Sequence, residues 1–266
     1  MIAALRSEFL KLTSVRLWWV MLLILVGYVG FTAGLLAGLF ATISNQASGA
    51  IPDEMLPPIV YSTATAVGYV FPLILGALAV TSEFRYQTLT PTFLAQPRRG
   101  VVLGAKAIVL AIAGAVYGIG ALVASVGLGA LVLSLVGVPT GLGDGDTWLL
   151  IARVVLAMAL WAAIGVGVGT LIPNQIASIV IVLAFTQFLE PILRFGTAFV
   201  EWTAAVGRFL PGAASDALVG ASVYTSLGTP TSTDPLEWWQ GGLVLAAYGV
   251  VIAIAGALTA WRRDVT

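Results

Sequence analysis

The sequence predicts an all-α membrane protein with six transmembrane helices, and three observations support this fold class. First, 59% of its 266 residues are hydrophobic and 9% are charged, whereas about a quarter of the residues in a soluble domain are charged. Second, apolar runs of about 18 residues or more recur, as in spanning helices. Third, most lysines and arginines lie between alternate runs. Because the runs extend over the whole chain, residues 1–266 are predicted to form a single membrane domain.

Residues 1–16 are predicted to form an amphipathic elbow helix that lies in the cytoplasmic membrane interface before the first span. Four apolar residues share one helical face, at steps of three or four: Ile2, Leu5, Phe9 and Leu12. The basic residues Arg6, Lys11 and Arg16 point elsewhere. The alternative is that this segment is only a positively charged flank that orients the first span.

The spans are expected at about residues 17–42, 59–80, 101–136, 148–171, 175–193 and 238–261. The third span is longer than the ~20 residues that a bilayer requires, so it tilts strongly or projects from the membrane. Pro72 is expected to kink the second span or to end a regular stretch of it. Small residues that let another helix approach closely are expected on the first and third spans: Gly30, Gly34, Gly38, Gly114 and Gly118.

The distribution of basic residues predicts which side of the membrane each segment faces. If both termini and the loop at residues 81–106 are cytoplasmic, nine of the 12 lysines and arginines lie inside, as the positive-inside rule requires. The nine are Arg6, Lys11, Arg16, Arg85, Arg98, Arg99, Lys106, Arg262 and Arg263. An even number of spans also places both termini on one side. We therefore expect a multi-pass protein of the cell membrane, plasma or inner, with both ends in the cytoplasm.

The loop at residues 81–106 is expected to contain a short helix across the cytoplasmic face. Thr90 and Pro91 are typical of an N-cap followed by the first helical residue, and Pro97 would end the helix. A purely solvated loop would not need apolar side chains among its charges, because exposed apolar groups favour cover. The side chains available for such a contact are Phe84, Leu89, Phe93 and Leu94.

Several kinds of chemistry are excluded by missing residues. The chain has no cysteine and no histidine, which rules out disulfides, thiol nucleophiles, imidazole bases and zinc sites built on these residues. No phosphate-binding P-loop is present, because neither Lys11 nor Lys106 follows a glycine. The HExxH and GxSxG motifs are also missing. We expect no enzymatic activity, no catalytic residue, and no metal or cofactor bound by this chain.

A group of polar residues near the outer membrane surface is a candidate gate. Gln187, Glu190 and Arg194 follow one another at steps of three and four, on one helical face. Arg153 lies at a comparable outer depth. The hypothesis is that Glu190 pairs with Arg153 or Arg194 and helps to form an outer gate. The alternative is that these groups lie at the interface and stay hydrated.

The chain resembles the permease subunit of ABC-2 type ABC transporters, in the style of small bacterial, actinobacterial members. The residues that carry the resemblance are RSEFLKLTSVRLWW at positions 6–19, EFRYQTLTPTFLAQPRRG at positions 83–100, and Lys106. The similarity covers essentially the whole chain. The loop pattern is fairly specific to this family, whereas the span count is not.

The resemblance implies a site and partners. The segment at residues 83–96 would be the coupling helix that docks on a separate ATP-binding subunit. By position, the docking residues would be Glu83, Phe84, Arg85, Thr88, Leu89, Phe93 and Leu94. Short re-entrant helices on the outer side would fall at about residues 198–224, with Pro211-Gly212 between them. The expected partners are two ATP-binding subunits, which hold ATP and Mg, a second permease copy and membrane lipid, but no nucleic acid.

The function implied by the resemblance is ATP-driven export of a hydrophobic or amphipathic substrate, such as a drug, a peptide or a lipid. One alternative is a channel or carrier that works without ATP. Such proteins carry several ionisable or broken-helix sites at mid-membrane, of which the sequence shows almost none. The other alternative is a membrane scaffold that transports nothing.

Overall fold

The computed structural model describes residues 1–46, 52–196, 201–223 and 236–259. Within these ranges the chain is helical and contains no strand. Six helical segments in the described ranges are long and apolar enough to cross a membrane, so the predicted span count is confirmed. They are Leu17–Ile43, Asp53–Arg85, Arg99–Val136, Gly145–Leu171, Gln175–Gly196 and Trp238–Thr259. The expected basic residues Arg262 and Arg263 lie outside the described residues.

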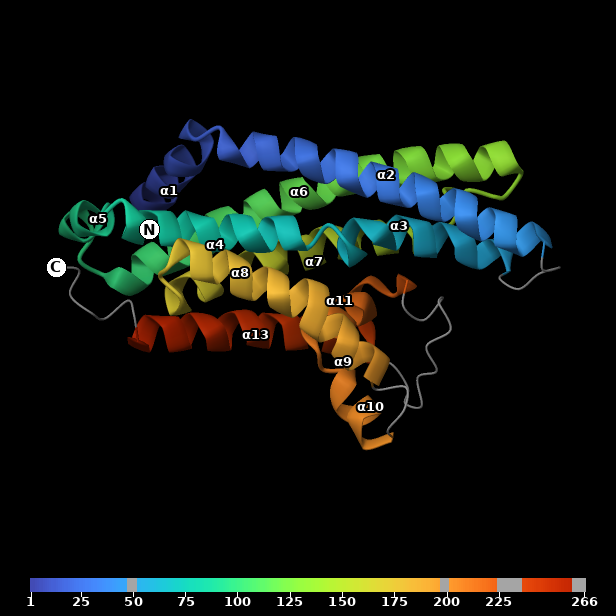
Figure 1. The fold of residues 1–266 in the computed structure, drawn as a ribbon. Helices are drawn as coiled ribbons and strands as arrows, with labels where there is room; N and C mark the ends of the chain where they lie inside the picture. The colour runs from blue at the N-terminus through green and yellow to red at the C-terminus, as the bar shows by residue number, and fades with distance from the viewer. Residues whose placement is uncertain (47–51, 197–200, 224–235, 260–266) are drawn as a thin grey trace.

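The first helix, α1 (Ile2–Ser14), precedes the spanning helix α2 (Leu17–Gln46) and is set at an angle to it (Figure 1). Of the four apolar residues predicted to face the membrane interface, Leu5 and Leu12 pack against the protein core, whereas Ile2 and Phe9 are exposed. The residue of α1 that is buried is Glu8. The predicted apolar face is therefore divided: half of it packs on protein, and the other half is free to face a membrane interface.

The second span lies at the centre of the bundle and is broken in its middle. It consists of α3 (Leu56–Ala66) and α4 (Val70–Arg85), after a 3-10 turn at Asp53–Met55. Pro72 is the third residue of α4 and has no N–H to donate to Gly68 O, so the break between α3 and α4 at residues 67–69 lies where this helical hydrogen bond is missing. Across the break, Phe71 N donates to Gly68 O at 3.1 Å. The prediction that Pro72 ends a regular stretch is confirmed.

The glycines predicted to form packing faces on the first and third spans do not all pack closely against another helix. At Gly118 of α6 (Arg99–Val136) an added Cβ would lie 3.1 Å from the backbone of α7 (Gly145–Leu171), and Gly114 is tighter still. Gly30 packs on α6, but Gly34 faces open space, and the nearest atom to a Cβ at Gly38 is 3.9 Å away. The packing stripe of α2 instead consists of Leu25, Val29, Ala33 and Ala37, all fully buried. Within this chain Gly34 packs on no other helix, because residues one position earlier in each turn face the bundle; packing of Gly34 on a second chain stays a prediction.

The fifth span changes its helix type along its length. It begins as α8 (Gln175–Ala184), passes through one π-helical segment, η2 (Phe185–Leu189), and ends as α9 (Glu190–Gly196). Two short helices follow, α10 (Glu201–Gly207) and α11 (Pro211–Val219), before the last span, α13 (Trp238–Thr259). Pro211-Gly212 opens α11 rather than separating the two short helices. Residues 198–200 and Tyr224 of the expected re-entrant segment lie outside the described residues.

One end of the bundle gathers α1, the end of α4, the short helix α5 (Leu89–Ala95) and the start of α6 (Figure 1). We call it the basic end, after its lysines and arginines: Arg6, Lys11, Arg16, Arg85, Arg98, Arg99 and Lys106. The predicted loop helix is thus present as α5 and ends before Pro97. It starts earlier than predicted, with Thr88 at the N-cap, because Gln87 turns the chain with a φ of 55°.

Candidate functional site

A cluster of buried charges joins four helices at the basic end. We call it the basic-end cluster; its members are Glu8 and Lys11 of α1, Glu83 of α4, Thr92 of α5 and Lys106 of α6. Lys106 is 1% exposed. Its ammonium pairs with Glu8, lies 3.0 Å from Glu83 Oε1, and donates to Ala79 O at 3.3 Å. These bonds offset the cost of removing the charge from water.

Lys11 completes the basic-end cluster from its edge. Its Nζ lies 2.7 Å from Glu8 Oε1 and 2.7 Å from Glu83 Oε1, and it donates to Thr92 Oγ1 at 3.3 Å. Burial lowers the pKa of the Lys11 ammonium, but its hydrogen bonds to the two carboxylates outweigh burial, so the net shift is upward. Two carboxylates therefore face two ammonium groups, and α5 is tied to them through Thr92.

The residues expected to dock a partner divide into buried and exposed sets. Glu83 and Leu89 are buried, and Phe84 and Phe93 pack partly against the core. Arg85, Thr88 and Leu94 are exposed, Leu94 to 80%. The surface that the segment at residues 83–96 offers to a partner therefore centres on these three, of which Leu94 lies within α5. A docking role for any of the seven residues stays a prediction.

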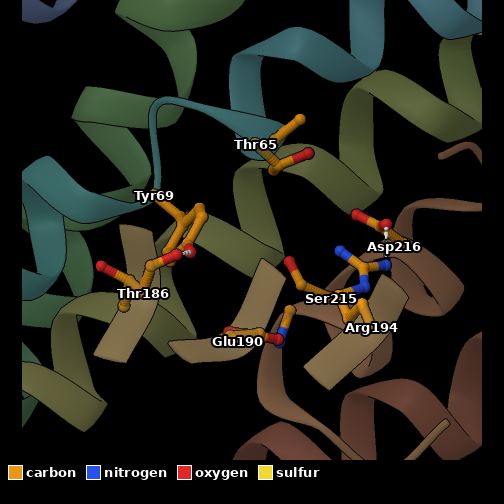
Figure 2. A pocket seen from close by; sticks show the side chains of 9 residues that line it. Thr65, Tyr69, Thr186, Glu190, Arg194, Ser215 and Asp216 are labelled. Carbon is orange, nitrogen blue, oxygen red and sulfur yellow. Dashed lines mark hydrogen bonds and ion pairs between the residues drawn. The ribbon is translucent and has the colours of Figure 1, made fainter. Parts of the chain in front are cut away.

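A second polar group lies where the fifth span meets α11, and we call it the Glu190 pocket (Figure 2). Glu190 is 2% exposed, and its Oε1 accepts a hydrogen bond from Gly212 N at 2.5 Å. Arg194 pairs with Asp216 at 2.5 Å, and the Ser222 hydroxyl donates to Asp216 at 2.6 Å. The pocket is lined by Thr65, Ala66, Tyr69, Thr186, Glu190, Arg194, Gly212, Ser215 and Asp216.

The local sequence explains why a carboxylate fits against α11. Pro211 is the first residue of this helix, so the N–H of Gly212 is one of the donors that has no partner within the helix. The positive end of the helix dipole favours a carboxylate at this position. A Cβ on residue 212 would lie 2.9 Å from Glu190 Cδ, so only glycine leaves room for the contact.

The break in the second span supplies the opposite wall of the pocket. The Tyr69 hydroxyl, beside the break, donates to Thr186 O at 3.2 Å, and the Tyr69 ring lies 4.4 Å from that of Trp161. Trp161 Nε1 donates to Ser215 Oγ at 3.1 Å. The cavity between these groups measures about 10 Å³, which is room for about one water molecule. Glu190 Oε2 is buried and has no hydrogen-bond partner.

Two residues of the predicted gate lie elsewhere. The guanidinium of Arg153 lies over the Trp238 ring, 4.9 Å from its centre, so the expected pairing of Arg153 with Glu190 was wrong. Arg153 instead lines a separate hollow of about 430 Å³ together with Glu54, Asp144 and Asp146. Gln187 is exposed, and its place facing the pocket is taken by Thr186. The π-helical turn has a wider i→i+5 spacing, which rotates position 187 away from the face of Glu190.

Sequence reasoning missed most of the pocket wall, namely Thr65, Tyr69, Thr186, Ser215 and Asp216. A signal for the break was present in Pro72, and Asp216 stands out as the one charged residue of α11. Neither signal indicates that these segments meet. Among the described residues, no three His, Cys, Asp or Glu side chains come together to hold a metal ion.

The sequence matches a known protein family, and this match agrees with the six-span architecture. The model of the ABC-2 family transporter protein matches residues 4–188, well over half of the 266-residue chain. This range includes α1, the basic-end cluster and the first four spans, and ends within η2. A comparison with curated proteins finds no match. The chain belongs to the ABC-2 family of transporter proteins.

Proposed function

We propose that this chain is the permease subunit of an exporter driven by a separate ATP-binding cassette subunit. The observation that carries the proposal is the basic-end cluster, which connects a partly exposed short helix, α5, to α1, α4 and α6. Charge-assisted hydrogen bonds hold these four helices in fixed geometry. A force applied to α5 would therefore pass to α1 and to the second and third spans instead of bending a loop.

The second part of the mechanism lies in the Glu190 pocket, which we propose as the outer gate. Gly212 N–H to Glu190 and Arg194 to Asp216 both tie α11 to the fifth span. Each of these two contacts is made by a single carboxylate, so a movement of the spans could break both contacts and separate α11 from the fifth span. Opening them would free α11 and release substrate on the side opposite the basic end. This version of the gate replaces the predicted role of Arg153 and Gln187.

The remaining assignments follow from the family and from charge. The basic end would face the cytoplasm of the cell, with both chain termini on that side. Two ATP-binding subunits would hold ATP and Mg there, and a second permease, identical or related, would complete the substrate path. Apolar spans suit a hydrophobic or amphipathic substrate such as a drug, a peptide or a lipid.

Substitution of Leu94 by glutamate tests the docking surface. Leu94 is 80% exposed on α5, so the substitution is expected to leave the fold intact and to abolish co-purification with the ATP-binding subunit. Thr13→Glu is the matched control, because Thr13 is exposed at the same end of the bundle but lies outside α5. Undiminished co-purification of the Leu94→Glu variant would count against docking on α5.

An ATP-independent carrier is a second candidate, and one observation favours it. The sequence suggested almost no broken-helix or ionisable sites at mid-membrane, but the second span breaks at residues 67–69, beside the buried Glu190. Carriers place such breaks at their binding sites. Reconstitution of the purified permease alone in lipid vesicles separates the two functions. Transport in the absence of any ATP-binding subunit would support the carrier, and transport that requires the subunit and ATP would support the exporter.

A further inference from the structure

The charges around the Glu190 pocket do not balance. Glu190 and Asp216 contribute two carboxylates, and Arg194 contributes one guanidinium, which leaves one formal negative charge. The guanidinium pairs with Asp216. Among the described residues, Tyr69 at the start of α4 also lines the pocket, and Tyr248 of α13 interacts electrostatically with Glu190. Glu190 is 2% exposed, and an ionised carboxylate without compensation is costly when it is buried in protein, so this site favours the uptake of one positive charge.

The cavity wall offers mainly acceptors. The hydroxyl of Thr65 donates to Ser62 O, and that of Thr186 donates to Val182 O. Tyr69 donates to Thr186 O. With these protons directed to backbone carbonyls, the hydroxyl oxygens present lone pairs to the cavity. Glu190 Oε2 adds a buried acceptor that has no partner. The wall also contains the donors Arg194 and Ser215, but Arg194 already pairs with Asp216. An occupant that donates hydrogen bonds or carries positive charge therefore satisfies the wall better than an anion does.

The size of the cavity further limits which positively charged species can bind. A cavity of about 10 Å³ admits a water-sized species and excludes an organic cation. We propose that the Glu190 pocket is a binding site for one monovalent inorganic cation, either a proton on Glu190 Oε2 or a sodium ion. With the cation bound the cluster is neutral, while Glu190 Oε1 keeps its hydrogen bond to Gly212. Occupancy therefore stabilises the contact between the fifth span and α11.

The proposal concerns the permease alone, so its test needs neither substrate nor ATP. Thermal unfolding of the purified full-length chain in lipid nanodiscs is measured against pH and, separately, against sodium chloride replaced by choline chloride. Binding to the folded state raises the unfolding midpoint with ligand concentration. We expect a rise of a few degrees, either on acidification or on addition of sodium. In Glu190→Gln the carboxylate is replaced by a neutral amide of the same shape, and the same response is lost. In Glu54→Gln an exposed carboxylate is removed, and the response is kept.

Infrared spectroscopy of the wild-type protein distinguishes the two cations. A bound proton gives a carboxylic-acid C=O band that is missing from Glu190→Gln, and bound sodium gives none but makes the unfolding midpoint rise with sodium. A wild-type protein with neither the band nor a sodium response overturns the proposal, even if Glu190→Gln does not fold. Equal pH and sodium responses in wild type and a folded Glu190→Gln variant also overturn it. None of these results depends on whether the chain exports a substrate.

Discussion

Two groups of buried charge lie within the part of the chain that the structure describes, and they differ in charge balance. The basic-end cluster sets two carboxylates against two ammonium groups. The Glu190 pocket holds two carboxylates against one guanidinium. Each group contains one buried carboxylate oxygen without a hydrogen-bond partner, Glu83 Oε2 and Glu190 Oε2, so the difference between them is one of charge balance. A balanced cluster with many bonds fixes the helices that supply it, because breaking any bond leaves a charge uncompensated. In a cluster whose charges do not balance, the excess charge can be compensated by an ion that binds from solution. The basic-end cluster is therefore suited to be a structural joint, and the Glu190 pocket is suited to bind a cation.

The two groups also differ in how they hold their helices. The basic-end cluster uses long side chains from α1, α4 and α6, with Lys106 1% exposed at its centre. The Glu190 pocket uses a backbone N–H at the start of α11 and one ion pair. The first arrangement resists separation of three helices at once, whereas the second joins only the fifth span and α11. Movement is therefore expected at the pocket before it occurs at the joint.

The largest expected effect comes from removing the central ammonium. Lys106→Met leaves Glu8 and Glu83 with Lys11 as their one cationic partner in the cluster, so the free energy of unfolding should fall by about 3–5 kcal/mol. Adding Glu8→Gln restores one carboxylate to one ammonium and should recover part of this loss. Denaturant unfolding in detergent measures both variants. If the double variant is as unstable as the sum of the two single variants, charge balance is not what stabilises the joint.

A smaller effect is expected at the pocket. Arg194→Gln removes the guanidinium that pairs with Asp216 and leaves both carboxylates uncompensated. The free energy of unfolding should fall by about 2–3 kcal/mol, as for loss of a charged hydrogen bond. Arg208→Gln is the control, because Arg208 is exposed and lies over the Phe209 ring. Equal losses in the two variants would remove the distinction between the pocket and an ordinary surface charge.

The smallest expected effect concerns the hydrogen bond between Lys11 and Thr92, which connects the basic-end cluster to α5. Thr92→Val removes the hydroxyl that accepts from Lys11 but keeps the shape of the side chain. Because Lys11 retains both carboxylates, stability should change by about 0.5–1.5 kcal/mol. Transport, measured with the ATP-binding subunit present, should fall by a larger fraction than the free energy of unfolding does. Normal transport in this variant would show that α5 moves the spans through other contacts.

The sequence was sufficient for the spans but not for the two charge groups. Hydropathy and the basic loops predicted six spans, and the chemistry of Pro72 predicted an interruption in the second. Lys106, by contrast, was counted as a basic residue of the cytoplasmic side and as part of the family resemblance, and nothing in the sequence paired it with Glu8. Their pairing spans 98 positions and depends on tertiary packing, which local periodicity does not encode.

The pocket was missed for a similar reason. Helical spacing correctly assigned Glu190 and Arg194 to one face, but that spacing assumes an α-helix, and the π-helical turn moved Gln187 out of the pocket and Thr186 into it. The partner surface, α11, is separated from Glu190 by 22 positions at Gly212. Glycine spacing likewise indicated a packing face on α2 without showing that Gly34 lies beside it.

The composition of the basic-end cluster has a practical consequence. Lys11 and Lys106 are the only lysines in the chain, so every side-chain primary amine of this protein belongs to that cluster. Lys106 is shielded from solvent and Lys11 is partly open. An acylating reagent would therefore modify Lys11 first, and its later appearance on Lys106 would record the moment at which the four helices come apart.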